Sequence, residues 1–230
     1  MNEKGRWNGL PLVIFGSGGI SREVAQLVED INANARTPVF QVIGFIEADG
    51  NSIGLEISAG LSVISCDKDF KDFASNFSVL GVVIPQGNPK IKRRIHDNVV
   101  ANVDNLVFPN LIHPSAVIPF SKIKMGIGNV ITAGVITNIG LQMGNFNLIN
   151  TGANIGHDVI IGNFCNINGV ASVSGEVVIG DEVLIGTGAS IIQGKRIGTG
   201  AVVSMGSAVI RNVPDFSTAI GVPAKIVKRV

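Results

Sequence analysis

The sequence predicts an α/β domain with a parallel sheet, followed by a parallel β-helix. Two features indicate this. Short apolar runs alternate with helical patterns over the first hundred or so residues, and from Ile149 to Val209 an aliphatic residue returns every six positions. The composition agrees, because 46% hydrophobic residues, 15% charged residues and 29 glycines suit a well-buried core with many tight turns. We expect one domain at residues 1–108 and a second at 109–230.

The N-terminal pattern predicts a strand, a glycine turn and a helix. The apolar run 10–15 is followed by Gly16, Ser17, Gly18 and Gly19, and helical spacing follows from Ser21, which we expect to be the N-cap. Glycines allow a ligand close to the backbone, and a helix N-terminus favours an anion. The third glycine of a GxGxxG motif is missing. A tight turn without a ligand therefore stays an alternative.

The rest of the first domain continues the alternation. Strands are expected at 40–46, 61–64, 78–84 and 105–108, and helices at 68–76 and 89–103. Glu47 follows the second strand, where this kind of fold often binds a nucleoside, although a solvated loop carboxylate is an equal alternative. In the last helix we expect a solvated basic face, made of Lys90, Lys92, Arg93 and Arg94.

The six-residue period predicts short strands joined by turns, with three units closing one triangular coil of 18 residues. The aliphatic residues point inward and stack about 4.8 Å apart. The position four residues later is also expected to be inward, which makes Cys165 a buried core thiol rather than a nucleophile. Upstream, a looser period runs through Ile112, Ile118, Val130 and Ile136, with one extra residue before Met143.

One of the three histidines is the best candidate for a catalytic residue. Of His96, His113 and His157, only His157 lies in a coil turn beside an acid, Asp158. One coil is 18 residues, so Gly175 should stack over His157, leave a slot beside the imidazole and expose its amide. A base beside an amide donor suits acyl transfer. An exposed histidine without a function is the alternative, and a zinc site is disfavoured because it needs three histidines that can meet.

The bulk properties narrow the function classes. A net charge of +1 gives no signal for nucleic acid. Two distant cysteines, Cys66 and Cys165, predict no disulfide framework and a cytoplasmic location. No apolar run approaches the roughly 20 residues of a membrane-spanning helix. We therefore expect no membrane association and no metal.

The sequence resembles a family of bacterial sugar acetyltransferases in which a Rossmann-like nucleotide-sugar domain precedes a left-handed β-helix of hexapeptide repeats. This family includes the bacillosamine and perosamine N-acetyltransferases and the sialic acid O-acetyltransferases. The resemblance covers nearly the whole chain. It is carried by the segments Val13-Ile-Phe-Gly-Ser-Gly-Gly, Ile43-Gly-Phe-Ile-Glu, Gly128-Asn-Val-Ile, Gly156-His-Asp and Gly221-Val-Pro-Ala-Lys. It implies the left-handed sense of the helix and a homotrimer.

The resemblance also implies roles for individual residues. His157 would be the catalytic base, with Asp158 as its acidic neighbour and Asn150 in support. Gly175 N–H would contact the thioester carbonyl. Acetyl-CoA would lie between subunits, at Thr187, Gly188, Ser204, Met205, Gly206 and Lys225. The nucleotide sugar would be held by the glycine turn from Gly16 to Gly19 and by Glu47, and also by Asn166, which stands where the family has a second histidine.

These roles imply a reaction, transfer of acetyl from acetyl-CoA to the amine of a nucleotide-linked 4-amino-4,6-dideoxy sugar, as in surface polysaccharide biosynthesis. The chain departs from the family at Ile20, where a histidine is common, and at Ala48, where a second acid is common. These departures leave the identity of the sugar nucleotide open. Two alternatives remain, which are O-acetylation of a sugar hydroxyl and a non-catalytic trimeric scaffold.

Overall fold

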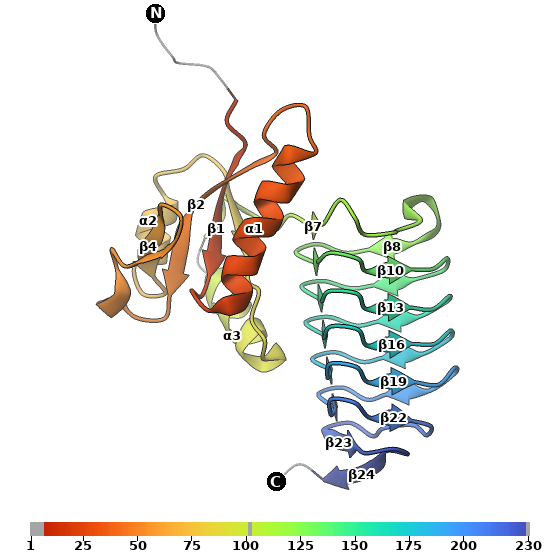
Figure 1. The fold of residues 1–230 in the computed structure, drawn as a ribbon. Helices are drawn as coiled ribbons and strands as arrows, with labels where there is room; N and C mark the ends of the chain where they lie inside the picture. Colours follow the sequence, from red (N-terminus) through yellow and green to blue (C-terminus); the bar gives the residue numbers. More distant parts are fainter. Residues whose placement is uncertain (1–6, 101–102, 229–230) are drawn as a thin grey trace, which may run out of the picture. The chain divides into compact units, whose positions relative to one another are not determined.

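The computed structural model describes residues 7–100 and 103–228 (Figure 1). The chain divides into two compact units. One unit comprises Met1–Gln86 and Arg94–Pro114, and the other comprises Gly87–Arg93 and Ser115–Val230. The division runs through a helix and not only through a linker. The domain boundary after residue 108 stays a proposal.

The first unit is built on one sheet with the order β3-β4-β2-β1-β5-β6. Its strands are β1 (Leu10–Phe15), β2 (Phe40–Glu47), β3 (Glu56–Ser58), β4 (Leu61–Cys66), β5 (Leu80–Val83) and β6 (Leu106–Val107), and β7 (Leu111–Ile112) follows them in the chain. All neighbouring strands of the sheet are parallel except β3 and β4. The strand order reverses beside β1, where β1 lies between β2 and β5. Ligands of open α/β sheets bind at such a point.

Three helices accompany this sheet, α1 (Gly19–Ala33), α2 (Phe70–Ala74) and α3 (Pro89–Val100), together with a short 3₁₀ turn, η1 (Gly50–Ser52). α1 begins two residues before Ser21, and its N-cap is Gly18. The predicted cap at Ser21 is therefore wrong, because Ser21 is inside the first turn and its side chain is buried. α3 is capped at its start by Asn88 Oδ1, which accepts from Lys90 N at 3.0 Å. Residues 101–102 of the predicted helix lie outside the described residues.

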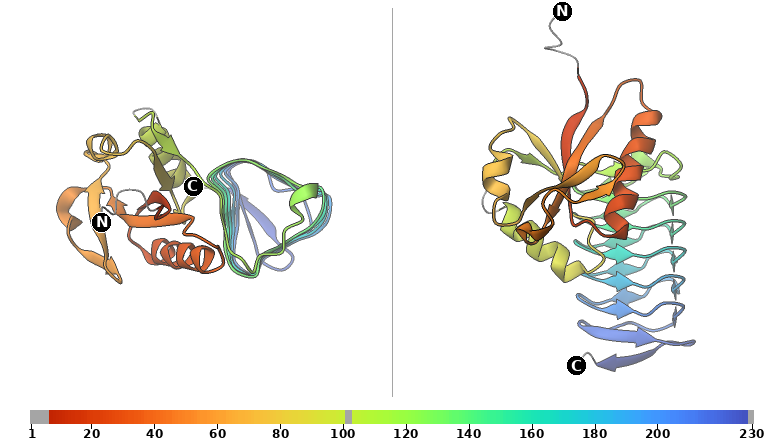
Figure 2. Two further views of the ribbon diagram at one scale, coloured as in Figure 1. Left: turned by 90° about the horizontal axis from the view of Figure 1, so that it is seen from above. Right: turned by 60° about the vertical axis from the view of Figure 1, so that its left-hand side comes forward.

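The second unit is a stack of three-sided coils that superimpose when viewed along the stack (Figure 2). A first face carries β10 (Ile136–Thr137), β13 (Asn154–Ile155), β16 (Ser172–Val173), β19 (Ser190–Ile191) and β22 (Ala208–Val209). A second face carries β8 (Lys124–Met125), β11 (Gln142–Met143), β14 (Ile160–Ile161), β17 (Val178–Ile179) and β20 (Arg196–Ile197). The third carries β9 (Val130–Ile131), β12 (Leu148–Ile149), β15 (Asn166–Ile167), β18 (Leu184–Ile185), β21 (Val202–Val203), β23 (Ser217–Ile220) and β24 (Lys225–Lys228).

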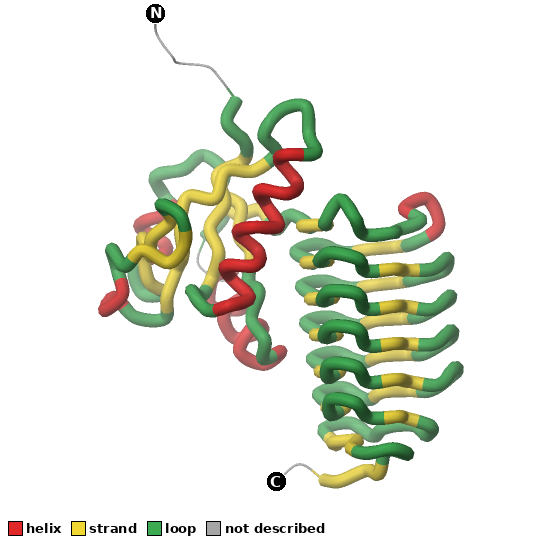
Figure 3. Tube along the Cα trace, viewed as in Figure 1, coloured by secondary structure: helices red, strands yellow, loops and turns green. Residues whose placement is uncertain are grey.

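The register of these faces confirms the predicted coil of 18 residues, because Ile149 pairs with Ile167 and Ile167 with Ile185. Short strands alternate with turns along the coils (Figure 3). The predicted inward aliphatic positions from Ile149 to Val209 are buried, and Cys165 is fully buried as predicted. A 3₁₀ turn, η2 (Phe120–Lys122), precedes the regular coils, and the antiparallel pair β23 and β24 closes the other end.

Upstream of Ile149 the structure corrects the predicted register. The inward residues are Ile131, Thr137 and Met143, which are six apart, and Ile136 is 45% exposed. There is no extra residue before Met143. The sequence pattern misled because a threonine occupies the inward position, while the preceding isoleucine points outward.

The predicted solvated face of α3 is also wrong at one position. Lys92 is 1% exposed, and its ammonium donates to Phe146 O at 3.1 Å, to Cys165 O at 3.4 Å and to Asn166 Oδ1. Burial lowers the pKa of Lys92 to about 7. The first turns of α3, which belong to the second unit, are thus fixed to the coils by a buried cation.

Candidate active site

The turns between the first and second faces of the coils form one edge, here named the histidine edge. It carries Ile139–Gly140, His157–Asp158, Gly175–Glu176 and Gln193–Gly194 in successive coils. Backbone hydrogen bonds join these turns, from Asp158 N to Ile139 O at 2.9 Å and from Glu176 N to His157 O at 2.8 Å. The coil period therefore fixes which residues are neighbours of His157.

His157 and Asp158 form a pair on this edge. His157 Nδ1 lies 2.9 Å from Asp158 Oδ2, and the two side chains are 49% and 62% exposed. An ionised carboxylate only accepts hydrogen bonds, so the pair places the proton of the neutral imidazole on Nδ1. Nε2 then keeps a free lone pair, which is the form a general base needs.

Gly175 lies directly against the imidazole, as the coil period predicts. A Cβ built on Gly175 would lie 2.5 Å from His157 Nε2 and 2.6 Å from Cε1. The predicted open slot is not there, because the ring itself occupies that space and Gly175 is buried. Its N–H has no acceptor within the described chain.

The residues predicted to bind acetyl-CoA lie mainly on another edge, named the small-residue edge. Its turns lie between the third and first faces and carry Thr151–Gly152, Gly169–Val170, Thr187–Gly188 and Met205–Gly206. Gly206 N donates to Thr187 O at 2.9 Å, so the turns at 187–188 and 204–206 are adjacent. Asn150 lies here too, and its Oδ1 accepts from Thr151 N at 2.8 Å. Within one chain, the coil path separates Asn150 and Thr187 from the histidine edge.

Lys225 is exposed on the closing strand β24 and lines a hollow of about 390 Å³. The hollow is formed mainly by apolar groups, including Val209, Ile210 and Ile226, with Arg211 as a second cation. Sequence reasoning did not single out Arg211, which stands in a turn of the repeat.

In the first unit, the glycine turn lies beside Glu47, the last residue of β2. Ser17 Oγ donates to Glu47 Oε1 at 2.5 Å. Gln86, which sequence reasoning missed, lies over the turn: its Nε2 donates to Phe15 O at 3.0 Å. Gly16 has φ +88, and a Cβ there would lie 2.5 Å from Gln86 Nε2, so only glycine suits this position.

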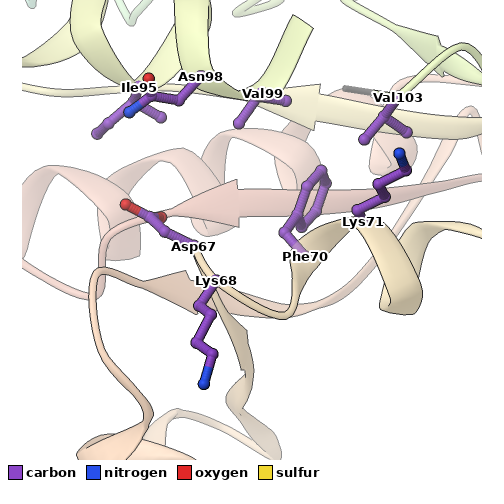
Figure 4. A pocket seen from close by; sticks show the side chains of 8 residues that line it. All are labelled: Asp67, Lys68, Phe70, Lys71, Ile95, Asn98, Val99 and Val103. Atoms are coloured by element: carbon purple, nitrogen blue, oxygen red, sulfur yellow. The ribbon is translucent and has the colours of Figure 1, made fainter. Parts of the chain in front are cut away.

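A pocket of about 180 Å³ lies between the start of α2 and the helix α3 (Figure 4). It is lined by Asp67, Lys68, Phe70, Lys71, Ile95, Asn98, Val99 and Val103. Asp67 follows β4 and donates its N–H to Glu47 O at 2.9 Å, so the pocket lies near the predicted substrate residues. Burial raises the pKa of Asp67, with Arg94 lowering it and Glu47 raising it less strongly.

Asn166 is placed differently from the prediction. Its side chain has no exposed surface, its Nδ2 donates to Gly87 O at 2.7 Å, and its Oδ1 accepts from Lys92. A buried amide with these partners supports the segment that carries Lys92. No sequence pattern indicated this contact, because Lys92 is 74 residues away.

Two further findings concern the site classes that the sequence disfavoured. The described residues hold no group of three or more His, Cys, Asp or Glu side chains able to bind a metal ion. Among the described helices, none combines the length and the apolar character needed to cross a membrane. The cytoplasmic location stays a prediction.

Residues 11–99 match the model of the PglD N-terminal domain. None of the curated proteins matches the chain by sequence. Among solved structures, a mutant of perosamine N-acetyltransferase from Caulobacter crescentus, in complex with CoA and GDP-perosamine, is 27% identical with a TM-score of 0.83. That match covers 95% of this chain and 97% of the other.

The acetyltransferase domain of PglB from Neisseria gonorrhoeae, in complex with acetyl coenzyme A, is 28% identical, with a TM-score of 0.79 over 95% of this chain and 100% of that one. WeeI from Acinetobacter baumannii, at 24% identity and a TM-score of 0.79 over 95% and 100% of the two chains, shares the fold. The predicted fold class, a Rossmann-like domain followed by a left-handed β-helix, is confirmed. The chain is thus similar, by its N-terminal family match and by its structure over nearly the whole length, to bacterial sugar acetyltransferases of the hexapeptide-repeat superfamily.

Proposed function

We propose that this protein is an acetyl-CoA-dependent N-acetyltransferase that acts on the amine of a nucleotide-linked amino sugar. The observation that carries the proposal is the His157–Asp158 pair, with Nδ1 held by the carboxylate at 2.9 Å and Nε2 left as the base. Solved relatives that bind CoA with GDP-perosamine, or acetyl coenzyme A, support the two substrate classes. The specific acceptor that we propose is a 4-amino-4,6-dideoxyhexose.

In the proposed reaction His157 Nε2 takes a proton from the sugar amine, whose nitrogen attacks the thioester carbon of acetyl-CoA. The tetrahedral oxyanion accepts a hydrogen bond from Gly175 N–H, a donor without an acceptor in the described chain. Collapse breaks the C–S bond, and the proton passes to the leaving CoA thiolate. The products are an amide and free CoA.

The two edges suggest how the substrates would meet. Thr187, Gly188 and Ser204–Gly206, proposed for acetyl-CoA, lie on the small-residue edge, while the base lies on the histidine edge. A homotrimer, in which one subunit's histidine edge meets a neighbour's small-residue edge, would complete the site, and Asn150 would reach it in the same way. The glycine turn with Glu47 would hold the nucleotide end of the acceptor.

The test is release of CoA thiol from acetyl-CoA in the presence of UDP-, GDP- or dTDP-linked amino sugars. His157→Asn should lower kcat by roughly 10²–10⁴ and leave acetyl-CoA binding nearly unchanged. His96→Asn is the matched control and should keep wild-type turnover. Turnover in His157→Asn close to that of the wild type would remove His157 as the base.

The product distinguishes the alternatives. An amide resists hydroxylamine, whereas an O-acetyl ester from a sugar hydroxyl is cleaved by it. CMP-sialic acid belongs in the same screen, because an O-acetyltransferase would accept it. A non-catalytic scaffold would show neither thiol release nor thermal stabilisation by acetyl-CoA.

A further inference from the structure

The space around the His157–Asp158 pair is made by two glycines in the adjacent coils. Gly175 lies in the following coil, against the imidazole. Gly140 lies in the preceding coil, against the carboxylate: a Cβ built there would overlap Asp158 Oδ1 and lie 3.0 Å from Cγ and 3.2 Å from Cα. The pair is therefore enclosed along the stack by two residues that lack side chains.

At Gly175 the reason for glycine is space and not backbone conformation. Its φ is outside the left-handed region, where L side chains are strained. The equivalent position in the next coil holds Gln193, and on the small-residue edge Thr151, Thr187 and Met205 stand at this turn position. The turn itself accepts side chains. What excludes one at residue 175 is the ring at 2.5–2.9 Å.

At residue 140 two reasons together favour glycine. Its φ is +77°, but Asp158 and Glu176 occupy the same turn position with φ of 56° and 60°. The conformation alone therefore does not require glycine. The carboxylate adds the second reason, because its Oδ1 fills the place of a Cβ while Oδ2 holds His157 Nδ1.

We propose that Gly140 and Gly175 are positioning residues that fix the orientation and the tautomer of His157. Gly140 lets the Asp158 carboxylate fold back to its bond with Nδ1. Gly175 lets the ring lie flat on the following coil, with Nε2 beside the backbone whose amide is the proposed oxyanion donor. The catalytic part of this inference rests on the proposed function, whereas the geometric part does not.

The first experiment is ¹⁵N NMR of the imidazole nitrogens, which reports the tautomer without any substrate. In Gly140→Ala the carboxylate is displaced, and the Nδ1–H signature of His157 should give way to a mixture with Nε2–H. Gly194→Ala is the matched control, since Gly194 has φ +69° at the same turn position and nothing within 4 Å of its Cβ place. An unchanged tautomer in Gly140→Ala, or an equal change in Gly194→Ala, overturns the proposal.

The second experiment covers the case in which the single variants are unstable. Gly175→Ala should lower Tm, and the loss should largely vanish when His157→Ala removes the ring. In the same way, Asp158→Ala should restore most of the Tm lost in Gly140→Ala. The part that is not restored should equal the loss in Gly194→Ala, which measures the strain of an alanine at positive φ alone. The control for Gly175→Ala is Gly169→Ala, whose Cβ meets only Thr151 O, at 3.3 Å. Double variants as unstable as the single ones contradict the proposal.

Kinetics separate this inference from the proposed function. Gly140→Ala and Gly175→Ala should lower kcat by about 10- to 100-fold with little change in either KM, because orientation and not binding is lost. If His157→Asn is inactive while both alanine variants keep wild-type kcat, the positioning role fails and the function stands. If the wild type transfers no acetyl group, the NMR and Tm results still decide the positioning role.

Discussion

At the residue scale, two buried threonines of the coils differ in whether their hydroxyl groups are hydrogen-bonded. Thr132 is 8% exposed, and its Oγ1 lies 3.2 Å from Thr151 Oγ1 and 3.4 Å from Ile149 O. Thr137 is 4% exposed, and its Oγ1 has no hydrogen-bond partner among the described residues. A buried hydroxyl without a hydrogen bond costs free energy, because it has lost water and gained nothing in exchange.

Thr137→Val should therefore raise the free energy of unfolding by about 1 kcal/mol, since it replaces an unbonded hydroxyl with a methyl of similar size. A gain of that size raises Tm by roughly 2–4 °C in a chain of this length. Thermal unfolding followed by circular dichroism measures it. Thr132→Val, the matched control, should lower Tm, and a gain in both variants would contradict the explanation.

At the element scale, the first turns of α3 depend on a cation that the coils bury. Lys92 Nζ has three oxygen acceptors among the described residues, and none of the three is a carboxylate. Burial of Cys165 raises the pKa of that thiol to about 12, so the thiol brings no negative charge. Desolvation therefore dominates, and the pKa of Lys92 falls from 10.5 to about 7. This makes the stability of the element depend on pH.

The direction of this pH dependence follows from which state of the chain binds the Lys92 proton. Below pH 7 both the folded and the unfolded chain hold the Lys92 proton, and the folded state carries the full cost of the buried charge. Between pH 7 and 10.5 only the unfolded chain holds it, so the free energy of unfolding rises by up to about 1.4 kcal/mol per pH unit from this group. Urea unfolding of Lys92→Met at pH 7, 8 and 9 should lack that contribution.

Lys90→Met is the control, because Lys90 is exposed on the same helix. It should keep the pH dependence of the wild type. Equal slopes in Lys90→Met and Lys92→Met would mean that the buried ammonium does not titrate in this range.

At the scale of the whole molecule, the coils expose apolar residues along their edges. Ile139 is 59% exposed, Val170 64% and Met205 75%. Apolar side chains repeated along one stack are typical of an association surface. Ile139 lies on the histidine edge, and Val170 and Met205 lie on the small-residue edge.

We therefore expect a homotrimer of about 72 kDa, three times the 24.0 kDa chain. Light scattering after size exclusion measures this mass. Val170→Asp should reduce it toward that of one chain and reduce acetyl transfer with it. Ile53→Asp, at a residue of the first unit that is 50% exposed, should leave the mass unchanged. A wild-type monomer with full activity would contradict the shared site.

The sequence by itself determined whatever depends on local pattern. The six-residue period gives the coil, the inward burial of Cys165 and the place of Gly175 against His157, because in a solenoid residues 18 apart are neighbours by construction. The resemblance assigned the glycine turn and Glu47 to one ligand, and the hydrogen bond from Ser17 Oγ to Glu47 Oε1 is a finding of the structure. Only the tertiary structure decided that Thr137 and not Ile136 points inward, that the imidazole fills the space over Gly175, and that Lys92 and Asn166 meet inside the second unit. A basic residue on a polar helix predicts solvent exposure unless its hydrogen-bond acceptors are known. The acceptors of Lys92 are coil residues 54 to 74 positions further along the chain.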